Sequence, residues 1–510
     1  MIITVLNRNN CKGEDKETID WLRSVLQYPD VWWKKNYMGH MKPQKIVRYM
    51  VDVRGRFLSG FIDKVRETNR IQGKDLTIKN YSLLHEGLKY ATPSLPGITL
   101  REDQLRLIED AKKRRSGLIK APTRSGKTVV AGGLISCLPN SRALFIVHTL
   151  DLLEQTVKEF KKFGFNVGAM GGGKVEASRM VTVATRQTFI KGLHTCPIDL
   201  YDLVIIDEAH HVVKLDGQYA KILNHLEPAI KIGFTATEPE KEGERLVMEG
   251  LLGPKIGELT QEEAKELKII AETKVKIYTI PKDPLAHGIK TYKEAYPELI
   301  VRKRSRNKFI MDIAKEYLDN DETVLIIVRR VAHGFNIQDM FKKFMPDIEV
   351  PFLCGGIDSD SLTEMTRVKA QIKKLETSIS FKHGKEKEEA KNSIYDLTTY
   401  LDTLKKMKDR IKDNSLRRGE YKDKLNNREI KCIIATNIFN EGVNIPTLNT
   451  IILAGAGKSE TQTIQSGSRA FTKSPGKEYG TLIDLFDPNY VGFVEHFGYR
   501  IAMYCSLGWM

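Results

Sequence analysis

Short hydrophobic runs alternate with amphipathic segments from about residue 100 onward. The first series of runs lies at residues 117–120, 143–148, 181–184, 203–206 and 231–234, and the second at residues 323–328, 350–353, 431–434, 450–453 and 481–484. Short apolar strands separated by helices are typical of a parallel sheet that is covered on both faces. The pattern therefore predicts an α/β fold with two tandem parallel-sheet domains, at residues 97–274 and 275–510.

The first 96 residues follow a different pattern, which predicts a small basic α/β domain. The expected elements are a helix near residues 16–27 and strands at residues 45–53, 56–62 and 76–78. The turn-rich segment 91–97 is expected to link this domain to the rest of the chain. Residues 1–97 contain 17 Lys and Arg against 10 Asp and Glu. We expect nucleic-acid phosphate contacts or, as the alternative, ordinary solvated charges at Lys34, Lys35, Arg54 and Arg56.

One long segment, residues 362–418, interrupts the second parallel-sheet domain. Its apolar residues recur at spacings of three and four in two runs, namely Met365, Val368, Ile372, Leu375 and Ile379, then Ala390, Ile394, Leu397, Leu401 and Leu404. Because this spacing gives a helix one apolar stripe, two such runs joined by a polar break predict an antiparallel helical hairpin. The hairpin is either a solvated structural insertion or a strand-separating wedge or partner contact.

Composition narrows the class of protein. Of the 510 residues, 41% are hydrophobic and 29% are charged, which excludes a mainly disordered chain. No apolar run approaches the roughly 18 residues of a membrane helix, and residues 1–16 lack a signal-like apolar region, so we expect a cytoplasmic protein. The six scattered cysteines form no CxxC pair, which disfavours a disulfide framework or structural zinc. The net charge of +16 favours a polyanionic partner, although a merely soluble basic protein can carry the same surplus.

The sharpest motif directly follows the predicted strand 117–120. Its sequence, APTRSGKT, comprises Ala121, Pro122, Thr123, Arg124, Ser125, Gly126, Lys127 and Thr128. It matches the phosphate-binding loop, with Ala121 in place of the usual first glycine, and a helix is predicted after it. Such a loop turns backbone N–H groups toward phosphates at a helix N-terminus. We expect Lys127 to reach the β- and γ-phosphates of ATP and Thr128 to bind Mg²⁺.

An acidic pair follows the predicted strand 203–206, in the sequence Asp207-Glu-Ala-His-His211. Carboxylates at the C-terminal end of such a strand are suited to holding a metal and activating water. We expect Asp207 to bind Mg²⁺ and Glu208 to orient or deprotonate the attacking water. His210 is either an ordinary surface histidine or a relay to the next motif.

Together the loop and the DEAH sequence resemble those of the superfamily 2 helicases, which contain two RecA-like domains. Gly233-Phe-Thr-Ala-Thr237 resembles the motif that couples hydrolysis to domain closure, and the remaining motifs follow in order to about residue 490. The resemblance implies that Gln104 contacts adenine and that Glu441 and Gly442 lie at the nucleotide. It also implies nucleic-acid contacts by His148, Thr185, Arg186, Arg329 and Thr436.

The last motif departs from this family. Residues 465–473 read QSGSRAFTK, whereas the family form QxxGRxxR ends in the arginine that stabilises charge on the γ-phosphate. Thr472 stands where that arginine is expected. The resemblance leaves three interpretations: Arg469 supplies the charge together with Gln465, Lys473 partly substitutes, or the ATPase is slow.

Within the superfamily, the chain resembles the UvsW-type helicases of bacteriophages. The sequences Val328-Arg-Arg-Val-Ala-His-Gly334 and Gly355-Gly-Ile-Asp-Ser-Asp-Ser361 carry this likeness, together with the small basic N-terminal domain. It implies an ATP- and Mg²⁺-dependent DNA helicase or translocase that remodels branched DNA in replication, recombination or repair. Its partner is then forked, branched or single-stranded DNA, bound largely without sequence preference by a monomer in the host cytoplasm, with replication or recombination proteins as further partners.

Two other functions fit the same motifs. The motor motifs do not distinguish the sugar, so an ATP-dependent RNA helicase is one of them, although the flanking regions lack an RNA-recognition signature. The altered residues 465–473 also fit an ATP-regulated nucleic-acid-binding module with weak turnover. ATP hydrolysis in the presence of single-stranded DNA, RNA or forked DNA separates the three functions.

Overall fold

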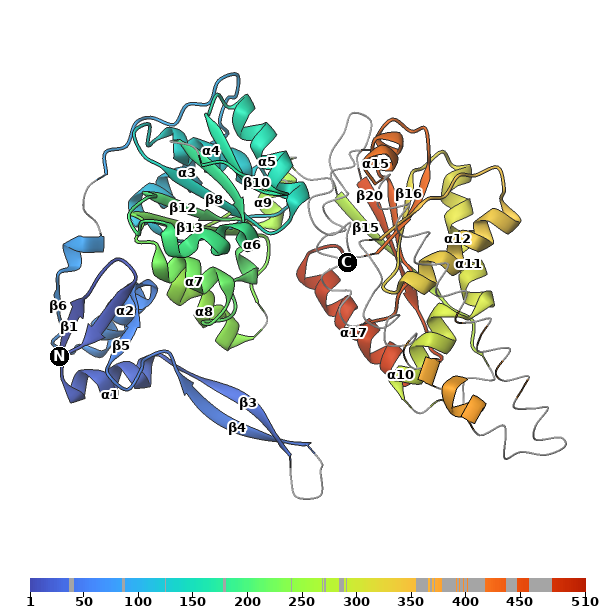
Figure 1. Ribbon diagram of the computed structural model, residues 1–510, viewed down its shortest axis with the longest axis horizontal. Coiled ribbons are helices and arrows are strands. Elements are labelled where there is room, and N and C mark those ends of the chain that lie inside the picture. The colour runs from blue at the N-terminus through green and yellow to red at the C-terminus, as the bar shows by residue number, and fades with distance from the viewer. Residues whose placement is uncertain are drawn as a thin grey trace. The chain divides into compact units, whose positions relative to one another are not determined.

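The structure is a computed structural model in which the chain forms two compact units, Met1–Ala264 and Lys265–Met510 (Figure 1). It describes residues 1–35, 41–84, 88–123, 125–177, 180–239, 241–267, 269, 272–283, 289, 291–354, 366, 369–370, 372–377, 391, 394, 398, 401, 418–436, 447–457 and 479–510. Each unit contains a large parallel sheet accompanied by helices. The predicted α/β class with two parallel-sheet domains is therefore confirmed.

The N-terminal domain contains a four-stranded sheet and two α-helices. In sheet order, its strands are β5 (Arg56–Leu58), β2 (Asn10–Gly13), β1 (Ile2–Val5) and β6 (Thr77–Lys79), and its helices are α1 (Lys16–Val25), α2 (Ile62–Gln72), η1 (Ser59–Phe61) and η2 (Tyr81–Leu84). The Asp15 carboxylate accepts a hydrogen bond from the backbone N–H of Thr18, which begins α1 where the sequence predicts a helix. Trp21 and Leu22 of α1 are buried in the core of the first unit.

A two-stranded ribbon extends from this domain (Figure 1). β3 (Gln27–Lys35) pairs antiparallel with β4 (Met41–Tyr49). The sequence pattern predicted only the end of β4, because Pro29 and Pro43 interrupt both runs and strand interiors rarely contain proline. At the base of the ribbon, the ring of Tyr28 packs against Gly243. A Cβ atom at position 243 would lie 2.4 Å from a ring carbon of Tyr28.

The rest of the first unit is built on an eight-stranded sheet. In sheet order, its strands are β10 (Lys174–Val175), β9 (Val167–Gly171), β11 (Val181–Thr185), β8 (Ala143–Val147), β12 (Leu203–Ile206), β13 (Ile230–Thr235), β7 (Ser116–Lys120) and β14 (Lys255–Glu258). Every pairing is parallel except that of β10 with β9. All five strands that the sequence predicts here are present, and four of them are buried at every residue.

Helices connect these strands in the βα alternation that the sequence predicts (Figure 1). They are α3 (Glu102–Arg114), α4 (Lys127–Ser136), α5 (Leu150–Lys162), α6 (Arg186–Phe189), η3 (Ile190–Thr195), η4 (Ala209–His211), α7 (Gln218–His225), α8 (Glu242–Leu252) and α9 (Gln261–Glu266). Among the described residues of the whole chain, no helix has the length and apolar character needed to cross a membrane.

The second unit contains a six-stranded sheet, and all of its pairings are parallel. In sheet order, the strands are β15 (Glu272–Thr279), β20 (Tyr479–Phe486), β19 (Thr450–Leu453), β16 (Val324–Ile327), β18 (Cys432–Ala435) and β17 (Phe352–Leu353). The helices are α10 (Tyr292–Ala295), η6 (Tyr296–Val301), α11 (Arg304–Asp319), α12 (Val331–Phe344), α15 (Arg418–Asn426) and α17 (Val491–Ser506). The five strands predicted for this domain are all present.

The predicted helical hairpin lies largely outside the described residues. The positions that are described between residues 366 and 401 are helical. The hydroxyl of Thr377 donates to the carbonyl of Lys373, and that of Thr398 donates to the carbonyl of Ile394, as hydroxyls do along a helix. How the two helical runs pair stays a prediction.

A buried seam fixes the N-terminal domain to the eight-stranded domain. The ammonium of Lys231 in β13 donates to Asn9 Oδ1 at 3.1 Å and to the carbonyl of Arg8 at 3.3 Å, and burial lowers its pKa to about 8. Asn9 in turn donates to the carbonyl of Leu226 at 2.7 Å. One cluster of buried apolar side chains includes residues of both domains. The two domains of the first unit therefore pack as one body.

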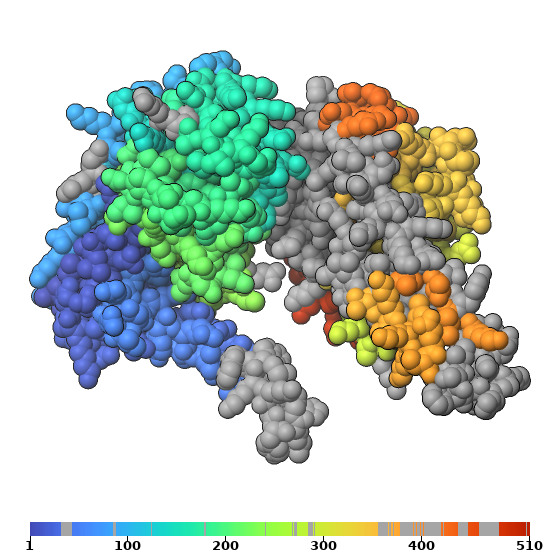
Figure 2. Space-filling view, viewed as in Figure 1, coloured from blue at the N-terminus to red at the C-terminus, as the bar shows by residue number. Residues whose placement is uncertain are grey.

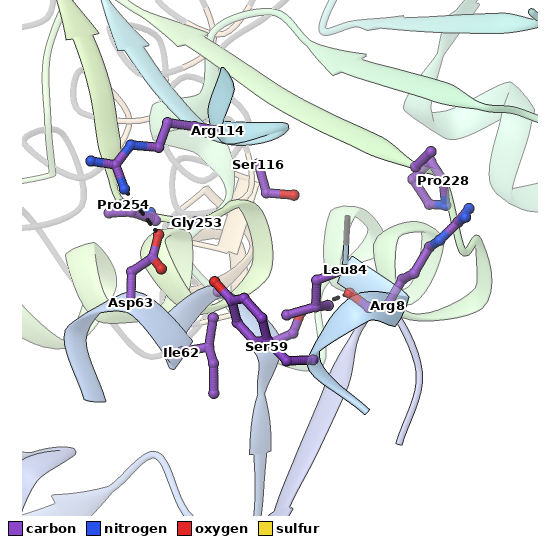
Figure 3. A pocket seen from close by; sticks show the side chains of 13 residues that line it. Arg8, Ser59, Ile62, Asp63, Leu84, Arg114, Ser116, Pro228, Gly253 and Pro254 are labelled. Carbon is purple, nitrogen blue, oxygen red and sulfur yellow. Dashed lines mark hydrogen bonds and ion pairs between the residues drawn. The ribbon is translucent and has the colours of Figure 1, made fainter. Parts of the chain in front are cut away.

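A small pocket of about 40 Å³ remains at this seam (Figure 3). Asp63 of the N-terminal domain faces Arg114 of α3 across it, with Asp63 Oδ2 and Arg114 Nη1 3.6 Å apart. A space of this size has room for one or two water molecules, whereas ligand pockets are typically several hundred Å³. The pocket is a gap in the packing of the seam and not a substrate site.

Because the seam is closely packed, we expect a substitution at Gly60 to lower the stability of the first unit. A Cβ atom there would lie 2.2 Å from the carbonyl oxygen of Glu249 and 2.5 Å from that of Gly250, both in α8. We expect Gly60→Ala to destabilise the first unit by about 1–3 kcal/mol, because backbone oxygens cannot move aside as a flexible side chain does. Chemical denaturation followed by circular dichroism measures the change. Gly192→Ala is the matched control, since a Cβ atom there meets nothing within 4 Å; equal stability of the two variants would contradict the prediction.

Candidate ATP-binding site

Three neighbouring strands bring the predicted motifs to one edge of the eight-stranded sheet. β13 pairs with β12 on one side and with β7 on the other, so that Gly233 lies opposite Ile206 and Thr235 opposite Lys120. Since the three strands are parallel, the loop after β7, the acidic pair after β12 and the end of β13 share the C-terminal edge. This edge is where open α/β sheets bind their ligands.

The loop after β7 has the backbone of a phosphate-binding loop. α4 begins at Lys127, directly after Gly126, whose φ angle of +92° lies in the left-handed region. A Cβ atom at Gly126 would lie 2.5 Å from Gln104 Nε2, so both the conformation and the space require glycine. The first N–H groups of α4 have no partner within the helix and favour an anion there.

A clamp from the preceding helix holds this loop in place. One guanidinium nitrogen of Arg101 donates to the carbonyl of Ser125 at 2.6 Å, and the same group forms an ion pair with Asp103 at 2.8 Å. The Ser125 hydroxyl donates to the carbonyl of Pro122 at 2.8 Å, which closes the turn. The ammonium of Lys127 donates to the carbonyls of Ala121 and Pro122, so it lies over the concave side of its own loop.

Gln104 lies beside the loop, although its oxygen has a structural role. The side chain is 2% exposed, and its Oε1 accepts from the backbone N–H of Arg101 at 3.1 Å to form the capping box that begins α3. Its Nε2 lies next to Gly126. The predicted contact with adenine stays a prediction.

The acidic pair occupies a tight turn. The backbone N–H of Glu208 donates to Asp207 Oδ1 at 3.0 Å, and Glu208 adopts a left-handed conformation with φ of +51°. Residues other than glycine pay roughly 1–2 kcal/mol for this conformation, which is concentrated at functional sites. The Glu208 side chain is only 6% exposed. The turn thus places the half-buried carboxylate of Asp207, which is suited to a metal, beside the buried carboxylate of Glu208, which is suited to positioning water.

A third carboxylate near the metal candidates has no signature in the sequence. Glu159 of α5 lies close enough to Thr128 and Asp207 for both to act on its carboxylate. Burial raises the pKa of Glu159, and the negative charge of nearby Asp207 adds to the rise, while Lys162 and Thr128 oppose it. Glu159 therefore connects the phosphate-binding loop with the acidic pair. The only sequence signal for Glu159 is its place on the face of α5 that turns toward α4. Periodicity alone does not distinguish that residue from its neighbours.

The donor set fits Mg²⁺ bound together with a nucleotide. Thr128 and Asp207 supply one hydroxyl and one carboxylate, and among the described residues no group of three or more His, Cys, Asp and Glu is arranged to hold a metal ion. Mg²⁺ commonly takes one or two protein ligands and completes its shell with water and phosphate oxygens. The pair is therefore suited to a metal that arrives with ATP.

The end of β13 is tied to the acidic pair through His210. Its Nδ1 lies 3.2 Å from Thr235 Oγ1 and 3.4 Å from Glu208 Oε2. The Thr235 hydroxyl donates to the carbonyl of Thr237 at 2.5 Å and accepts from the Thr237 N–H at 3.2 Å. His210 thus contacts the motif that follows it, as the relay interpretation predicts, and it is not an ordinary surface histidine.

Three histidine rings stack beside this site. His148, which follows β8, lies parallel to His211 with ring centroids 4.0 Å apart and an interplanar angle of 10°, and His211 is 4.3 Å from His210. Burial lowers the pKa of His148 and of His210 to about 4 and that of His211 to about 3. We call these three residues the histidine stack. His211 thus stacks on His148, whereas the ring of His210 is tilted by 39° to that of His211.

The other predicted site residues are spread over both units. Thr185 is 3% exposed and donates to the Thr188 hydroxyl, so its hydroxyl faces into the domain, and the guanidinium of Arg186 lies 5.2 Å from the ring of Tyr219. Arg54 and Arg56 are exposed on the N-terminal domain. In the second unit, Thr436 follows β18, and Arg329 lies 5.9 Å from the ring of Tyr296. Arg124, Glu441, Gly442, Gln465, Arg469 and the side chains of Lys34 and Lys35 lie outside the described residues.

Two family models match separate parts of the chain. The family described as type III restriction enzyme, res subunit, matches residues 97–240, and the helicase conserved C-terminal domain matches residues 398–472. The DNA 3′-5′ translocase XPB2 of Sulfurisphaera tokodaii is 25% identical over 74% of this chain and 79% of its own length. The ATP-dependent DNA helicase uvsW of Enterobacteria phage T4 is 21% identical over 73% of this chain and 65% of its own. Together these matches indicate a superfamily 2 helicase that resembles UvsW.

A solved structure supports the same fold. The ATP-dependent type ISP restriction-modification enzyme LlaBIII bound to DNA aligns with 96% of this chain and 39% of its own, with 14% identity and a TM-score of 0.53. At this identity the likeness concerns the fold alone. The chain also spans slightly less than two thirds of the length of the phage uvsW helicase. The relatives support an ATP-dependent helicase or translocase that uses a nucleic-acid substrate.

The histidine stack makes a prediction about acid stability. In the unfolded chain each of the three histidines titrates near the ordinary value of about 6.5, well above the lowered pKa values in the folded protein. Between about pH 6.5 and pH 4 the unfolded state therefore binds more protons than the folded state. We expect the stack's contribution to stability to be complete above about pH 6.5 and to fall as the pH drops toward 4.

Thermal unfolding at a series of pH values measures this effect. The variant His211→Phe keeps an aromatic ring and removes one buried titrating group, so its stability should fall less between about pH 7 and pH 5 than that of the unaltered protein. His194→Ala is the control, because His194 is exposed on η3 in the same domain. Parallel pH curves for the unaltered protein and His211→Phe would contradict the prediction.

Proposed function

We propose that this protein is an ATP-driven DNA translocase and helicase that remodels branched DNA, by fork regression, junction branch migration or unwinding. The observation that carries the proposal is the convergence of the phosphate-binding loop, the acidic pair and Thr235 at one edge of three adjacent strands. Two relatives support the choice of DNA, since one bears the name DNA translocase and the other DNA helicase.

Different residues of the first unit have different roles in the proposed hydrolysis of ATP. Lys127 supplies a fixed positive charge for the β- and γ-phosphates, and Glu208, held by its left-handed turn and by His210, orients the attacking water. Thr128 and Asp207 would hold Mg²⁺, which would supply positive charge for the phosphate oxygens. His210 and Thr235 then connect the state of this site with the backbone after β13.

Residues of the second unit complete the proposal by resemblance. Gln465 and Arg469 are proposed to stabilise the charge that develops during hydrolysis, with Glu441 and Gly442 contributing at the nucleotide. Nucleic acid is proposed to contact Arg329 and Thr436 in this unit and His148, Thr185 and Arg186 in the first. The arrangement of these contacts rests on the family resemblance.

Basic residues of the N-terminal domain are proposed to hold the duplex part of the substrate. Arg54 and Arg56 are exposed, and Lys34 and Lys35 lie on β3 of the ribbon. Phosphate contacts position a protein without reading sequence and make binding weaken with salt. Since the N-terminal domain packs as one body with the eight-stranded domain, a duplex held here would move with the ATP-binding site.

Steady-state ATP hydrolysis in the presence of single-stranded DNA, single-stranded RNA or forked DNA tests the proposal. The proposal predicts that forked DNA stimulates hydrolysis most and that the fork is unwound or regressed. Strongest stimulation by RNA would instead support an RNA helicase. Negligible turnover together with tight ATP-dependent binding would support a regulated binding module.

The first variant test concerns the two central catalytic residues. Lys127→Ala is expected to abolish hydrolysis, because the γ-phosphate loses its counter-charge. Glu208→Gln should still bind ATP yet block turnover, since an amide cannot accept the proton of water. A fluorescent ATP analogue measures binding, and phosphate release measures turnover. Glu208→Gln hydrolysing ATP at a near-normal rate would remove Glu208 from the proposed mechanism.

The second variant test identifies the positive charge supplied by the second unit. Arg469→Ala is expected to reduce hydrolysis by roughly a factor of 10³ or more, the scale of an arginine finger, while Lys473→Ala should cost much less. Both rates are measured at saturating ATP and forked DNA. The reverse order of the two effects would transfer the role to Lys473.

A further inference from the structure

The histidine stack joins two predicted functions that the motifs treat separately. His148 follows β8, in the segment that by resemblance tracks the nucleic-acid strand, whereas His210 and His211 follow the acidic pair at the end of β12. β8 and β12 are adjacent parallel strands, with Ile146 opposite Ile206, so both segments leave the sheet at the same edge. The stack is the column of side chains that connects them above the sheet.

The contacts along the stack are continuous. Parallel rings of His148 and His211 at 4.0 Å leave no space between them, and His211 contacts His210 at 4.3 Å. The Nδ1 of His210 then reaches Glu208 Oε2 at 3.4 Å. All three histidines are half-buried. A shift of His148 by about an ångström would therefore move His211 with it or break the contact between their rings.

Charged groups around the stack lie at its two ends. Arg186 of α6 is the cation that acts on both His148 and His211, and its guanidinium is placed over the ring of Tyr219 from α7. Lys127 and Asp207 act on His210 at the other end. One end of the column is thus beside a basic residue that can meet a phosphate backbone, and the other end is beside the phosphate-binding loop and the acidic pair.

We propose that His211 is a positioning residue through which nucleic acid bound near His148 and Arg186 sets the orientation of Glu208. The inference rests on the proposed function, because it requires ATP hydrolysis that nucleic acid stimulates. His211 acts by ring packing alone: bound nucleic acid fixes His148, the stacked His211 fixes His210, and His210 holds the Glu208 carboxylate toward the site of the attacking water. Loss of the central ring should leave both ends intact but disconnected.

The first experiment compares how strongly single-stranded DNA stimulates ATP hydrolysis in four proteins. The unaltered protein, His211→Ala, His211→Phe and the control His194→Ala are each measured with and without saturating DNA, and the ratio of the two rates is taken. Couplings between sites commonly correspond to factors of 5 to 150. We expect His211→Ala to lower the ratio at least about five-fold, His211→Phe to restore most of it, and His194→Ala to leave it unchanged.

The second experiment measures the same coupling without turnover. Coupling between two ligands is reciprocal, so a non-hydrolysable ATP analogue must change the affinity for DNA by the factor by which DNA changes the affinity for the analogue. Fluorescence anisotropy of a labelled oligonucleotide gives its dissociation constant with and without the analogue. We expect the difference that the unaltered protein shows to shrink toward none in His211→Ala, while the affinity without the analogue stays the same.

The outcomes separate this inference from the proposed function. If the unaltered protein hydrolyses no ATP, or is stimulated by neither DNA nor RNA, the proposed function and the inference both fail. If it is stimulated and His211→Ala keeps the full ratio, only the inference fails. A lowered ratio that His211→Phe does not restore would also overturn it, because ring packing would then not be the cause. If His211→Ala does not fold, as shown by circular dichroism, His211→Gln, which removes the ring but keeps a polar side chain, replaces it with the same expected contrast to His211→Phe.

Discussion

The pairing of β13 with both β12 and β7 is the constraint on which the rest of the site depends. In a parallel sheet every strand leaves at the same edge, so the registers that place Thr235 opposite Lys120 and Gly233 opposite Ile206 also fix the separation of the loop and the acidic pair. A shift of one residue would exchange the side chains on the two buried faces of β13. The geometry of the site therefore depends on largely buried strands, and Thr235 at the end of β13 contacts the site residues.

Two left-handed residues convert this edge into a site. Gly126 turns the chain into α4 at no steric cost. Glu208 adopts a comparable left-handed conformation, but its side chain makes that conformation unfavourable in free energy. Packing around the turn offsets that cost, since Ala209 is fully buried and His211 stacks on His148. The loop is in turn held by Arg101, so both halves of the site are shaped before any ligand binds.

The sequence predicted the elements that are buried on one or both faces. It did not predict the features that depend on individual contacts. Ten apolar runs became strands because burial on both faces leaves an unambiguous hydrophobic signal. The β3–β4 ribbon gave little signal, since it is largely exposed and contains Pro29 and Pro43. The loop and the acidic pair were visible as motifs of local spacing. Glu159 and His211 were not, because their roles arise from contacts between segments that lie far apart in the chain.

As the link between His148 and His211, a ring contact has an advantage over a hydrogen bond. A hydrogen bond would tie His211 to one protonation state, and burial beside Arg186 already keeps its imidazole neutral by lowering its pKa to about 3. Stacked neutral rings transmit position without transferring a proton, so the water-activating Glu208 keeps its own protonation while its orientation changes. Under the proposed function, nucleic acid stimulates ATP hydrolysis, and this coupling needs such a separation, because a carboxylate that lost its charge on every binding event would no longer activate water.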